Sequence, residues 1–243
     1  MFSPSGPTAR ELAVQALSSV ERGYDLLAPS FDATPFRTPD LVLDPVVRAV
    51  RALGPFRSGL DVCCGTGAGT EALRRLCADR VTGVDFSAGM LARARAALPP
   101  APDGPGVGWV RADARALPFV SAFDLVTSFG AFGHFLPAER PDLFAGIHRA
   151  LRPGGLFVFP LPAPPPVGSR TYWSLWAFDA VMRVRNRVWR PPFVMYYRTF
   201  RLADVRDELV RAGFSVGSIP LEELGRRPDG APNCRLVTAR RTG

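Results

Sequence analysis

The sequence contains no lysine, so arginine carries all 30 of its basic side chains. Histidine occurs only as His134 and His148, and the four cysteines show no Cys-x-x-Cys spacing. A secreted disulfide framework and a zinc finger are therefore both excluded. No group of Asp and His residues has the spacing of metal ligands, so we expect no metal site.

Long apolar runs are also missing. No stretch approaches the roughly 18 apolar residues of a membrane-spanning helix, and the first residues lack the basic and apolar regions of a signal peptide. We therefore expect a cytoplasmic protein. The chain has 47% hydrophobic and 21% charged side chains, which excludes disorder and is typical of a globular domain. Its net charge of +8 indicates affinity for anionic surfaces or substrates.

Residues 1–56 are predicted to form a helical appendage. The capping box Thr8-Ala9-Arg10-Glu11 predicts a first helix that ends before Gly23. A second helix is predicted to begin at Asp44-Pro45, because proline suits the first helical position, and to stop at Gly54.

From about residue 57 onward, short apolar runs alternate with helical patterns. Such alternation is typical of βαβ units, and it predicts a doubly wound α/β domain with a parallel sheet covered by helices on both faces. The strands are expected at 59–63, 80–84, 107–112, 123–128, 156–161, 214–219 and 234–240. The helices are expected at 69–77, 88–97, 138–151 and 202–213.

A glycine-rich turn follows the first of these strands. Glycines at 65, 67 and 69 let a ligand approach the backbone closely, and Asp85 ends the next strand 20 residues after Gly65. A carboxylate there can accept both ribose hydroxyls of an adenosine, from NAD or from S-adenosylmethionine. The dinucleotide fingerprint needs Gly or Ala where this chain has Thr70, and this departure disfavours NAD.

Five motifs in order resemble the class I S-adenosylmethionine-dependent methyltransferases, over about residues 57–161. The motifs are DVCCGTGAGT, VTGVDFSAGMLARAR, WVRADARALPF, FDLVTSFGAFGHF and LRPGGLFVF. The resemblance implies a seven-stranded sheet of order 3-2-1-4-5-7-6, with the seventh strand antiparallel, within a domain of residues 57–243.

The resemblance also implies S-adenosylmethionine as the cofactor and a role for each matching residue. We expect the appendage of residues 1–56 to cap this cofactor site. The methionine end of the cofactor would contact Asp61 and the turn of Gly65, Thr66, Gly67 and Gly69, and the ribose would contact Asp85. The adenine would lie against Phe86, Met90, Asp113 and Ala114, and the reactive methyl near Ser128 and Phe129. One departure is Cys63, which stands where the family usually has glycine.

Some of these residues also have simpler interpretations. Asp85 can cap the helix that starts after Ser87, Asp113 can form an Asx-turn, and Met90 can be a core residue. The cysteines are interpreted as buried small hydrophobes.

His134 follows the fourth strand, on the side where the family faces its substrate. It is the candidate catalytic base, and the alternative is an orienting or packing histidine. His148 falls within a helix and is interpreted as a surface or packing residue. The sequence Ser128-Phe129-Gly130-Ala131 replaces the [DN]-P-P-[YF] signature of methyltransferases that act on DNA amines.

Residues 162–200 form an insertion rich in aromatic residues and arginine. We predict a mobile lid over the acceptor, with Trp173, Trp176, Tyr196 and Tyr197 as acceptor-binding residues together with Tyr24. Alternatively, these aromatic and guanidinium groups contact an anionic membrane, stack on RNA bases, or form a helix packed on the domain with solvated arginines.

The predicted function is methyl transfer from S-adenosylmethionine to a small apolar or aromatic metabolite by in-line displacement. Two alternatives stay open: a quinone-type C-methyltransferase acting at the membrane, and a cofactor-binding or RNA-binding protein without turnover. A nucleic-acid partner is disfavoured, peripheral membrane contact stays open, and neither the oligomeric state nor the acceptor can be read from the sequence.

Overall fold

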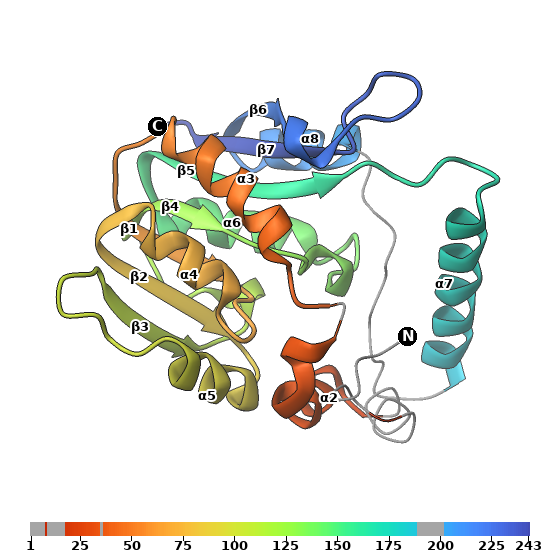
Figure 1. The fold of residues 1–243 in the computed structure, drawn as a ribbon, viewed down its shortest axis with the longest axis horizontal. Helices are drawn as coiled ribbons and strands as arrows, with labels where there is room; N and C mark the ends of the chain where they lie inside the picture. Colours follow the sequence, from red (N-terminus) through yellow and green to blue (C-terminus); the bar gives the residue numbers. More distant parts are fainter. Residues whose placement is uncertain (1–7, 9–17, 35, 189–201) are drawn as a thin grey trace.

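A computed structural model describes residues 8, 18–34, 36–188 and 202–243 of the chain. A seven-stranded sheet of order β3-β2-β1-β4-β5-β7-β6 forms its centre (Figure 1). The pairings among β1 to β5 are parallel, whereas β7 runs antiparallel to both β5 and β6. The predicted strand order and the antiparallel seventh strand are therefore confirmed.

The strands begin and end close to the predicted positions, and their bounds are β1 Phe56–Val62, β2 Cys77–Asp85, β3 Gly106–Arg111, β4 Phe123–Thr127, β5 Leu151–Pro162, β6 Phe214–Pro220 and β7 Cys234–Arg241. The β5 strand starts earlier than predicted because Leu151 pairs with Phe123 directly after the preceding helix. Both side chains are buried, so this first residue of β5 contributes to the core.

Alternate residues of the central strands point to opposite faces of the sheet, as the period of two requires. Leu125 and Leu156 pack on the face covered by α3 (Asp40–Arg51) and α4 (Ala68–Arg74). Val126 and Phe157 pack on the face covered by α6 (Arg140–Ala150) and α8 (Leu202–Arg211). The sheet thus has a helical layer on each face, as predicted.

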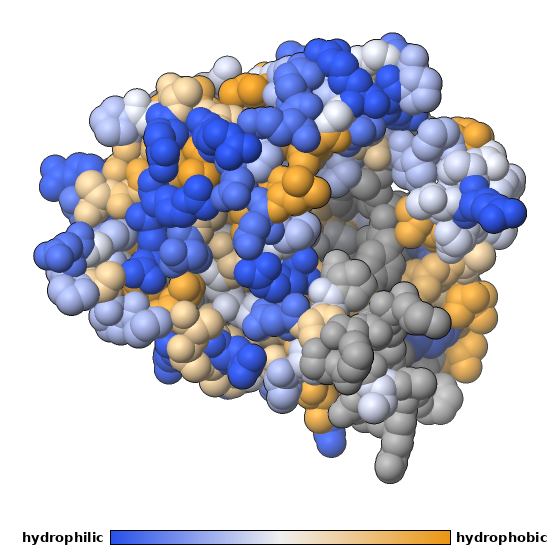
Figure 2. All heavy atoms as spheres, in the orientation of Figure 1, coloured by the Kyte–Doolittle hydropathy of each residue, from blue (hydrophilic) through white to orange (hydrophobic). Residues whose placement is uncertain are grey.

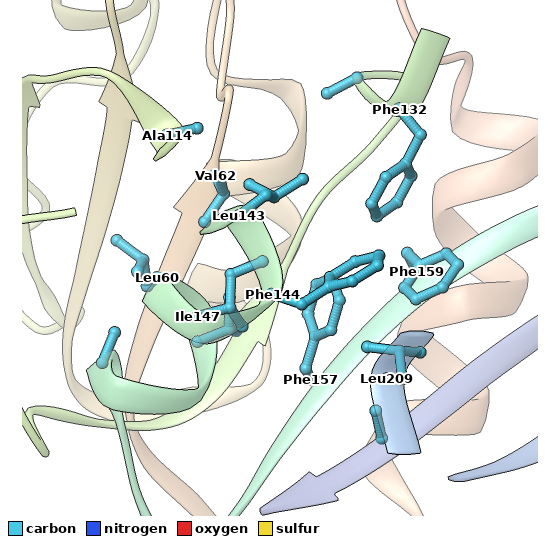
Figure 3. Packing of buried hydrophobic residues seen from close by; sticks show 14 of the residues in the cluster. Leu60, Val62, Ala114, Phe132, Leu143, Phe144, Ile147, Phe157, Phe159 and Leu209 are labelled. Atoms are coloured by element: carbon cyan, nitrogen blue, oxygen red, sulfur yellow. The ribbon is translucent and has the colours of Figure 1, made fainter. Parts of the chain in front are cut away.

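The larger core lies between the sheet and helices α6 and α8. Figure 3 shows Phe144 of α6 close to Phe157 and Phe159 of β5, with Leu209 of α8 at the edge of the cluster. The ring centroids of Phe157 and Phe159 lie 5.0 Å apart. These fully buried rings hold the strands rigidly, and the strand ends in turn carry the site described below.

The helices before the sheet differ from the prediction. Helix α2 (Val20–Leu27) is capped by the Ser19 side chain and continues through Gly23, which was predicted to lie beyond the helix. Gly23 is buried, and its N–H donates to the Ser19 carbonyl, so this glycine lies within the helix and does not end it. Residues 9–17, which carry most of the predicted capping box, lie outside the described residues.

Helix α3 also begins earlier than predicted, at Asp40 rather than at Asp44-Pro45. Leu43, Val46, Val47 and Val50 form its buried face, and this helical spacing starts before the proline. The prediction was wrong because it treated Pro45 as the first helical residue. Pro45 instead lies inside the helix and is buried with the apolar face.

The remaining helices are α5 (Ala88–Ala97), which matches the prediction, and α7 (Arg170–Val188), which lies within the predicted insertion. Helix α4 ends at Arg74, three residues before the predicted end, because Cys77 already belongs to β2. Short 3-10 segments η1 (Ala28–Ala33), η2 (Ala114–Ala116), η3 (Phe132–His134) and η4 (Glu222–Leu224) connect the elements.

Candidate active site

A cavity of about 550 Å³ opens where the carboxyl ends of β1 to β4 meet. One side, here called the strand wall, consists of residues from the ends of these strands and the segments after them, between Cys63 and Glu139. The other side, the N-terminal wall, consists of Val20, Tyr24, Phe31 and Phe36. Ligands of open α/β sheets bind at this edge, so the cavity is the candidate active site.

Asp85 joins two strand ends on the strand wall. It is the last residue of β2, and its carboxylate accepts a hydrogen bond of 2.9 Å from the Gly65 N–H and another of 2.9 Å from the Ser87 N–H. Burial raises the pKa of this carboxyl group, although the backbone N–H donors oppose that rise. The carboxylate is held on two sides and still lines the cavity.

Glycine is present at positions 65, 67 and 69 for different structural reasons. Gly65 has a φ of 53°, lines the cavity, and has only Phe31 within 4.0 Å of the position that a Cβ would occupy. Gly67 has a φ of 96° and caps α4, while a Cβ on Gly69 would lie 2.6 Å from an Asp61 carboxylate oxygen. Close packing therefore requires Gly69, whereas the backbone of Gly65 is open to a ligand.

Cys63 lines the cavity with a φ of 58°, a left-handed conformation that a non-glycine residue adopts at a cost of about 1–2 kcal/mol. This explains why a glycine would suit the position. Burial raises the pKa of the Cys63 thiol well above its usual range, and three nearby Asp side chains raise it further. The thiol is therefore protonated and is no nucleophile.

Asp61 lies behind the strand wall rather than in the cavity lining. Its carboxylate accepts hydrogen bonds from the hydroxyls of Thr70 at 3.0 Å and Thr127 at 3.3 Å. Burial raises the pKa of Asp61 to about 7, although the two hydroxyl donors lower it. A carboxyl group near its pKa at neutral pH therefore sits directly under the glycine turn.

Asp113 faces both the cavity and an arginine. Its carboxylate accepts from the Arg115 N–H at 2.9 Å, which is the Asx-turn interpretation, and pairs with the Arg115 guanidinium at 2.6 Å. These contacts with Arg115 lower the pKa of Asp113, so it stays ionised. Arg115 also pairs with Glu139 at the cavity rim.

The N-terminal wall is attached to the strand wall by acidic side chains. Asp25 accepts from the Ser87 hydroxyl at 2.5 Å and the Gly89 N–H at 2.9 Å. Asp32 accepts from the Thr66 hydroxyl at 2.6 Å, at the glycine turn itself. A Cβ on Gly89 would lie 3.1 Å from the Asp25 Cα, so this glycine lets α2 approach α5 closely.

Tyr24 and His134 meet across the cavity from opposite walls. The Tyr24 hydroxyl lies 2.8 Å from His134 Nε2, and the two rings meet edge to face with centroids 5.4 Å apart. The Tyr24 ring also lies 6.4 Å from that of Phe86 and 6.3 Å from that of Phe31. A hydrogen-bonded phenol and imidazole therefore occupy an otherwise aromatic part of the cavity.

Nine of the residues singled out from the sequence line the cavity together: Tyr24, Gly65, Asp85, Phe86, Met90, Asp113, Ala114, Phe129 and His134. Met90 is also fully buried, so its core interpretation holds as well. Thr66 and Gly67 lie in the turn and Gly69 lies in the first turn of α4, and none of the three lines the cavity. Ser128 donates instead to the Val62 carbonyl at 3.0 Å, joining β4 to β1.

The predicted acceptor-binding tryptophans are not brought to the cavity. Trp173 and Trp176 lie on α7 with 55% and 48% of their surfaces exposed, and neither lines the cavity. Tyr196 and Tyr197 lie outside the described residues. His148 packs edge to face on Phe214 at 5.1 Å, which agrees with its interpretation as a packing residue.

Several lining residues were missed by the sequence reasoning. They are Val20, Phe31, Phe36, Cys63, Val84, Ala112, Arg115, Gly130, Ala131, Phe135, Leu136 and Glu139. Those that neighbour the recognised motifs in the sequence could have been predicted from that neighbourhood. Phe31 and Phe36 carry no such signal, because their segment is brought to the cavity by long-range contacts that have no sequence motif, such as that of Asp32 with Thr66.

Two negative observations apply to the described ranges only. Within them, no three His, Cys, Asp or Glu side chains gather in a way that could hold a metal ion. No helix among the same residues has the length and apolar character needed to cross a membrane.

Residues 60–155 match a protein-family model described as a methyltransferase domain. The chain is 37% identical over 107 residues to an uncharacterized methyltransferase of Synechocystis sp., covering 44% of this chain and 47% of that protein. It is 32% identical over 157 residues to a demethylmenaquinone methyltransferase of Lactiplantibacillus plantarum, covering 60% and 64%. The chain therefore spans less than two thirds of the length of these curated relatives.

Solved structures with the same fold cover the chain more completely. The structure of the DhpI–SAH complex matches 97% of this chain and 99% of its own, with a TM-score of 0.63 and 20% identity. An S-adenosylmethionine-dependent methyltransferase from Mesorhizobium loti matches 82% and 100%, with a TM-score of 0.55 and 26% identity. The first of these similarities shows the fold alone.

Proposed function

We propose that the chain is a class I S-adenosylmethionine-dependent methyltransferase and that it transfers a methyl group to a small aromatic or apolar acceptor. The observation that carries the proposal is the convergence of Gly65, Asp85 and the Tyr24–His134 pair on one cavity. The first two residues suit the cofactor, and the pair suits an acceptor that must lose a proton.

The strand wall fits S-adenosylmethionine chemically. Each Asp85 oxygen accepts one backbone N–H, which leaves further lone pairs for the two ribose hydroxyls. Phe86 and Met90 offer an apolar surface to the adenine, while Asp113 and Ala114 lie at the same edge. The open space beside Gly65 would take the part of the cofactor between ribose and methionine.

Asp61 would position the methionine end of the cofactor indirectly, by supporting the glycine turn that contacts it. Thr66, Gly67, Gly69, Ser128 and Phe129 complete the set that the family resemblance assigns to the cofactor. Of these, Phe129 lines the cavity, and Ser128 fixes the end of β4.

We further propose that the segment before the sheet, within residues 1–56, caps the site and shapes the acceptor pocket. Val20, Tyr24, Phe31 and Phe36 line the cavity from that segment, and Asp25 and Asp32 fasten it to the strand wall. Aromatic rings on this wall suit a flat or apolar acceptor, because they exclude water and offer π-faces.

The chemistry needs little covalent assistance from the protein. When bound, the cofactor supplies a methyl group on a sulfonium, which is already a good leaving group. The protein's task is to hold the acceptor in line with that methyl, and to take a proton when the acceptor is a hydroxyl.

The Tyr24–His134 pair can take that proton. With His134 Nε2 as hydrogen-bond acceptor, the Tyr24 hydroxyl donates to it across 2.8 Å. The phenol oxygen can then receive the acceptor's proton while its own proton passes to Nε2. The acceptor oxygen gains the methyl group, and the proton ends on His134, which acts as the base.

A quinone-type acceptor is the second candidate. The relatives of Lysinibacillus sphaericus and Lactiplantibacillus plantarum are demethylmenaquinone methyltransferases, and the aromatic cavity suits a quinone ring as well. With a carbon acceptor the leaving proton comes from carbon, so the same base would act after attack rather than before it.

Mass spectrometry of a cell extract incubated with the protein and an isotopically labelled methyl donor tests the proposal. The expected result is one small molecule that gains the label, together with release of S-adenosylhomocysteine. A protein that binds the cofactor yet labels nothing and releases no S-adenosylhomocysteine would be a binding protein, and the proposed activity would be refuted.

A further inference from the structure

Helix α7 carries an unusual share of the exposed apolar surface. Of the 12 large hydrophobic side chains that are exposed within the described ranges, six lie on this helix: Trp173, Trp176, Phe178, Val181, Val184 and Val188. Soluble monomers rarely gather exposed apolar side chains in one place without a binding reason.

The spacing places most of these side chains on one face. At about 100° per residue, Trp173, Ala177, Val184 and Val188 form a single stripe along the helix, with Val181 beside it. Val184 and Val188 are 65% and 75% exposed. The stripe is defined here by Trp173, Trp176, Val181, Val184 and Val188, and it runs for most of a helix about 28 Å long.

The opposite face of α7 packs on the protein. Met182 is buried against Val20 and Tyr24, which belong to the N-terminal wall of the cavity. Asp179 is also buried, and it pairs with Arg183 at 3.0 Å. The helix therefore has an orientation fixed by its inner contacts, and the stripe faces away from the domain.

The exposed charged side chains of α7 all have the same sign. Arg170, Arg183 and Arg187 are exposed on α7, whereas the only acidic residue of the helix, Asp179, is buried with 2% exposure. The whole chain is also basic, with a net charge of +8. Arg170 and Arg187 lie at the two ends of the stripe, and Arg183 lies beside it. An apolar stripe with exposed arginines at its ends and edge is complementary to an anionic lipid surface, since the apolar side chains enter the acyl boundary and the long arginine side chains reach the headgroups.

The position of α7 in the fold also agrees with a lipid surface as its partner. In Figure 1, α7 stands apart from the sheet on the side toward which β5 points, and in Figure 2 hydrophobic atoms gather along that edge of the molecule. A tryptophan pair with ring centroids 6.1 Å apart lies near its first turn. Tryptophan side chains are enriched at membrane interfaces, where they anchor a helix lying in the surface plane.

We propose that the outer face of α7 docks the protein on the surface of an anionic lipid bilayer. The helix lies in the interface with its stripe toward the acyl chains and its arginines at the headgroups. Docking itself does not depend on methyl transfer. Its consequence for the acceptor does rest on the proposed function, because a cavity held at the interface suits an acceptor that dissolves in lipid.

Co-sedimentation with vesicles, measured without cofactor or acceptor, tests the docking. We expect the full chain to sediment with vesicles of phosphatidylcholine mixed with phosphatidylglycerol, and far less with phosphatidylcholine alone. Added salt should weaken the binding, because exposed charges are screened. Neutralising Arg170 and Arg187 to Gln should lower vesicle affinity about fivefold for each arginine removed.

A charge within the stripe gives the sharper comparison. Val184→Glu should lower vesicle affinity at least tenfold, whereas Val210→Glu should not change it. Val210 is an exposed valine on a different helix, α8, and is the matched control. Both variants should keep the circular dichroism and the melting temperature of the wild type, because both side chains are exposed.

Several results would overturn the proposal. These are absence of sedimentation with the anionic vesicles, equal binding to neutral vesicles, and vesicle binding that Val184→Glu leaves intact. A dimer in solution that Val184→Glu dissociates, without vesicle binding, would assign the stripe to a second copy of the chain instead. Vesicle binding by a protein that labels no acceptor would leave the docking standing and refute only the proposed function.

Discussion

The strand wall of the cavity carries backbone groups and buried carboxylates among its apolar side chains, whereas the N-terminal wall consists of three aromatic rings and one valine. Asp61 and Asp85 are almost fully buried behind or within the strand wall, each with two hydrogen-bond donors. On the other wall, Asp32 is 40% exposed and holds its segment by a side-chain contact with Thr66. The strand wall is positioned by the sheet, whereas the N-terminal wall is attached by side-chain contacts that are more accessible to solvent.

In the proposed function, this difference corresponds to a division of roles between the two walls, with the cofactor on the strand wall and the acceptor at the N-terminal wall. A cofactor common to many enzymes can be held by a fixed set of strand ends, because those ends are positioned by the sheet. An acceptor that differs between enzymes is better accommodated by a wall that the sheet does not dictate. The Tyr24–His134 pair joins the two walls, so the reaction would need both in place.

The largest expected effect comes from breaking this junction. If the acceptor is a hydroxyl, His134→Gln should lower turnover by roughly 10²- to 10⁴-fold, because the proton then has no base. Tyr24→Phe should lower it by a similar factor, and the double variant should be little slower than either single variant, since the two residues act as one relay. Steady-state assays with the identified acceptor provide the measurement.

His148→Gln is the matched control for that series, because His148 packs against Phe214 and is the only other histidine of the chain. Its turnover should equal that of the wild type. A rate for His134→Gln close to the wild type on a hydroxyl acceptor would remove the base role. Cofactor affinity should be nearly unchanged in all of these variants.

The next effect concerns the buried carboxylates of the strand wall. With the pKa of Asp61 at about 7 when folded and 3.8 as its ordinary value, the folded state retains a proton that the unfolded state has lost between these pH values. Stability should therefore fall as pH rises from about 4 to 7, by about 4 kcal/mol from this group, and then level off.

Urea denaturation of wild type and Asp61→Asn across this pH range measures that effect. The difference between the two proteins should shift steadily in favour of Asp61→Asn as the pH rises. Asp103→Asn, at an exposed position, is the control and should run parallel to the wild type. Parallel curves for Asp61→Asn and the wild type would mean that Asp61 is ionised throughout.

A smaller effect should follow from loosening the N-terminal wall. Thr66→Val removes the hydroxyl that donates to Asp32 at 2.6 Å, a bond worth about 0.5–1.5 kcal/mol. Hydrogen exchange over α2 and η1 should then become up to about tenfold faster, with the strands unchanged. Thr242→Val, which removes a 2.6 Å bond to the Gly213 carbonyl far from the cavity, should leave that segment unaffected.

The contrast between the walls also explains what the sequence could predict. Gly65 and Asp85 were identified from their 20-residue spacing, because two adjacent parallel strands place their ends side by side whatever the rest of the chain does. Strand order followed from the same local patterns through the family resemblance. These features depend on short-range sequence and on the regular geometry of a sheet.

Phe31, Phe36 and the orientation of α7 could not be predicted in that way. Phe31 and Phe36 reach the cavity through long-range side-chain contacts that carry no motif, such as Asp32 with Thr66. Trp173 and Trp176 were assigned to the acceptor from composition and position in the chain. Their exposure depends on which face of α7 packs on Val20 and Tyr24, and tertiary contacts determine that orientation.

Calorimetric titration with S-adenosylhomocysteine tests the division of labour most directly. Asp85→Asn should weaken binding about ten- to a hundredfold, because a charge-assisted contact to the ribose worth roughly 1.5–3 kcal/mol is lost. Asp79→Asn, on the same strand away from the cavity, and His134→Gln should bind like the wild type. Undiminished binding by Asp85→Asn, or a loss with His134→Gln as large as with Asp85→Asn, would contradict the assignment of the cofactor to the strand wall.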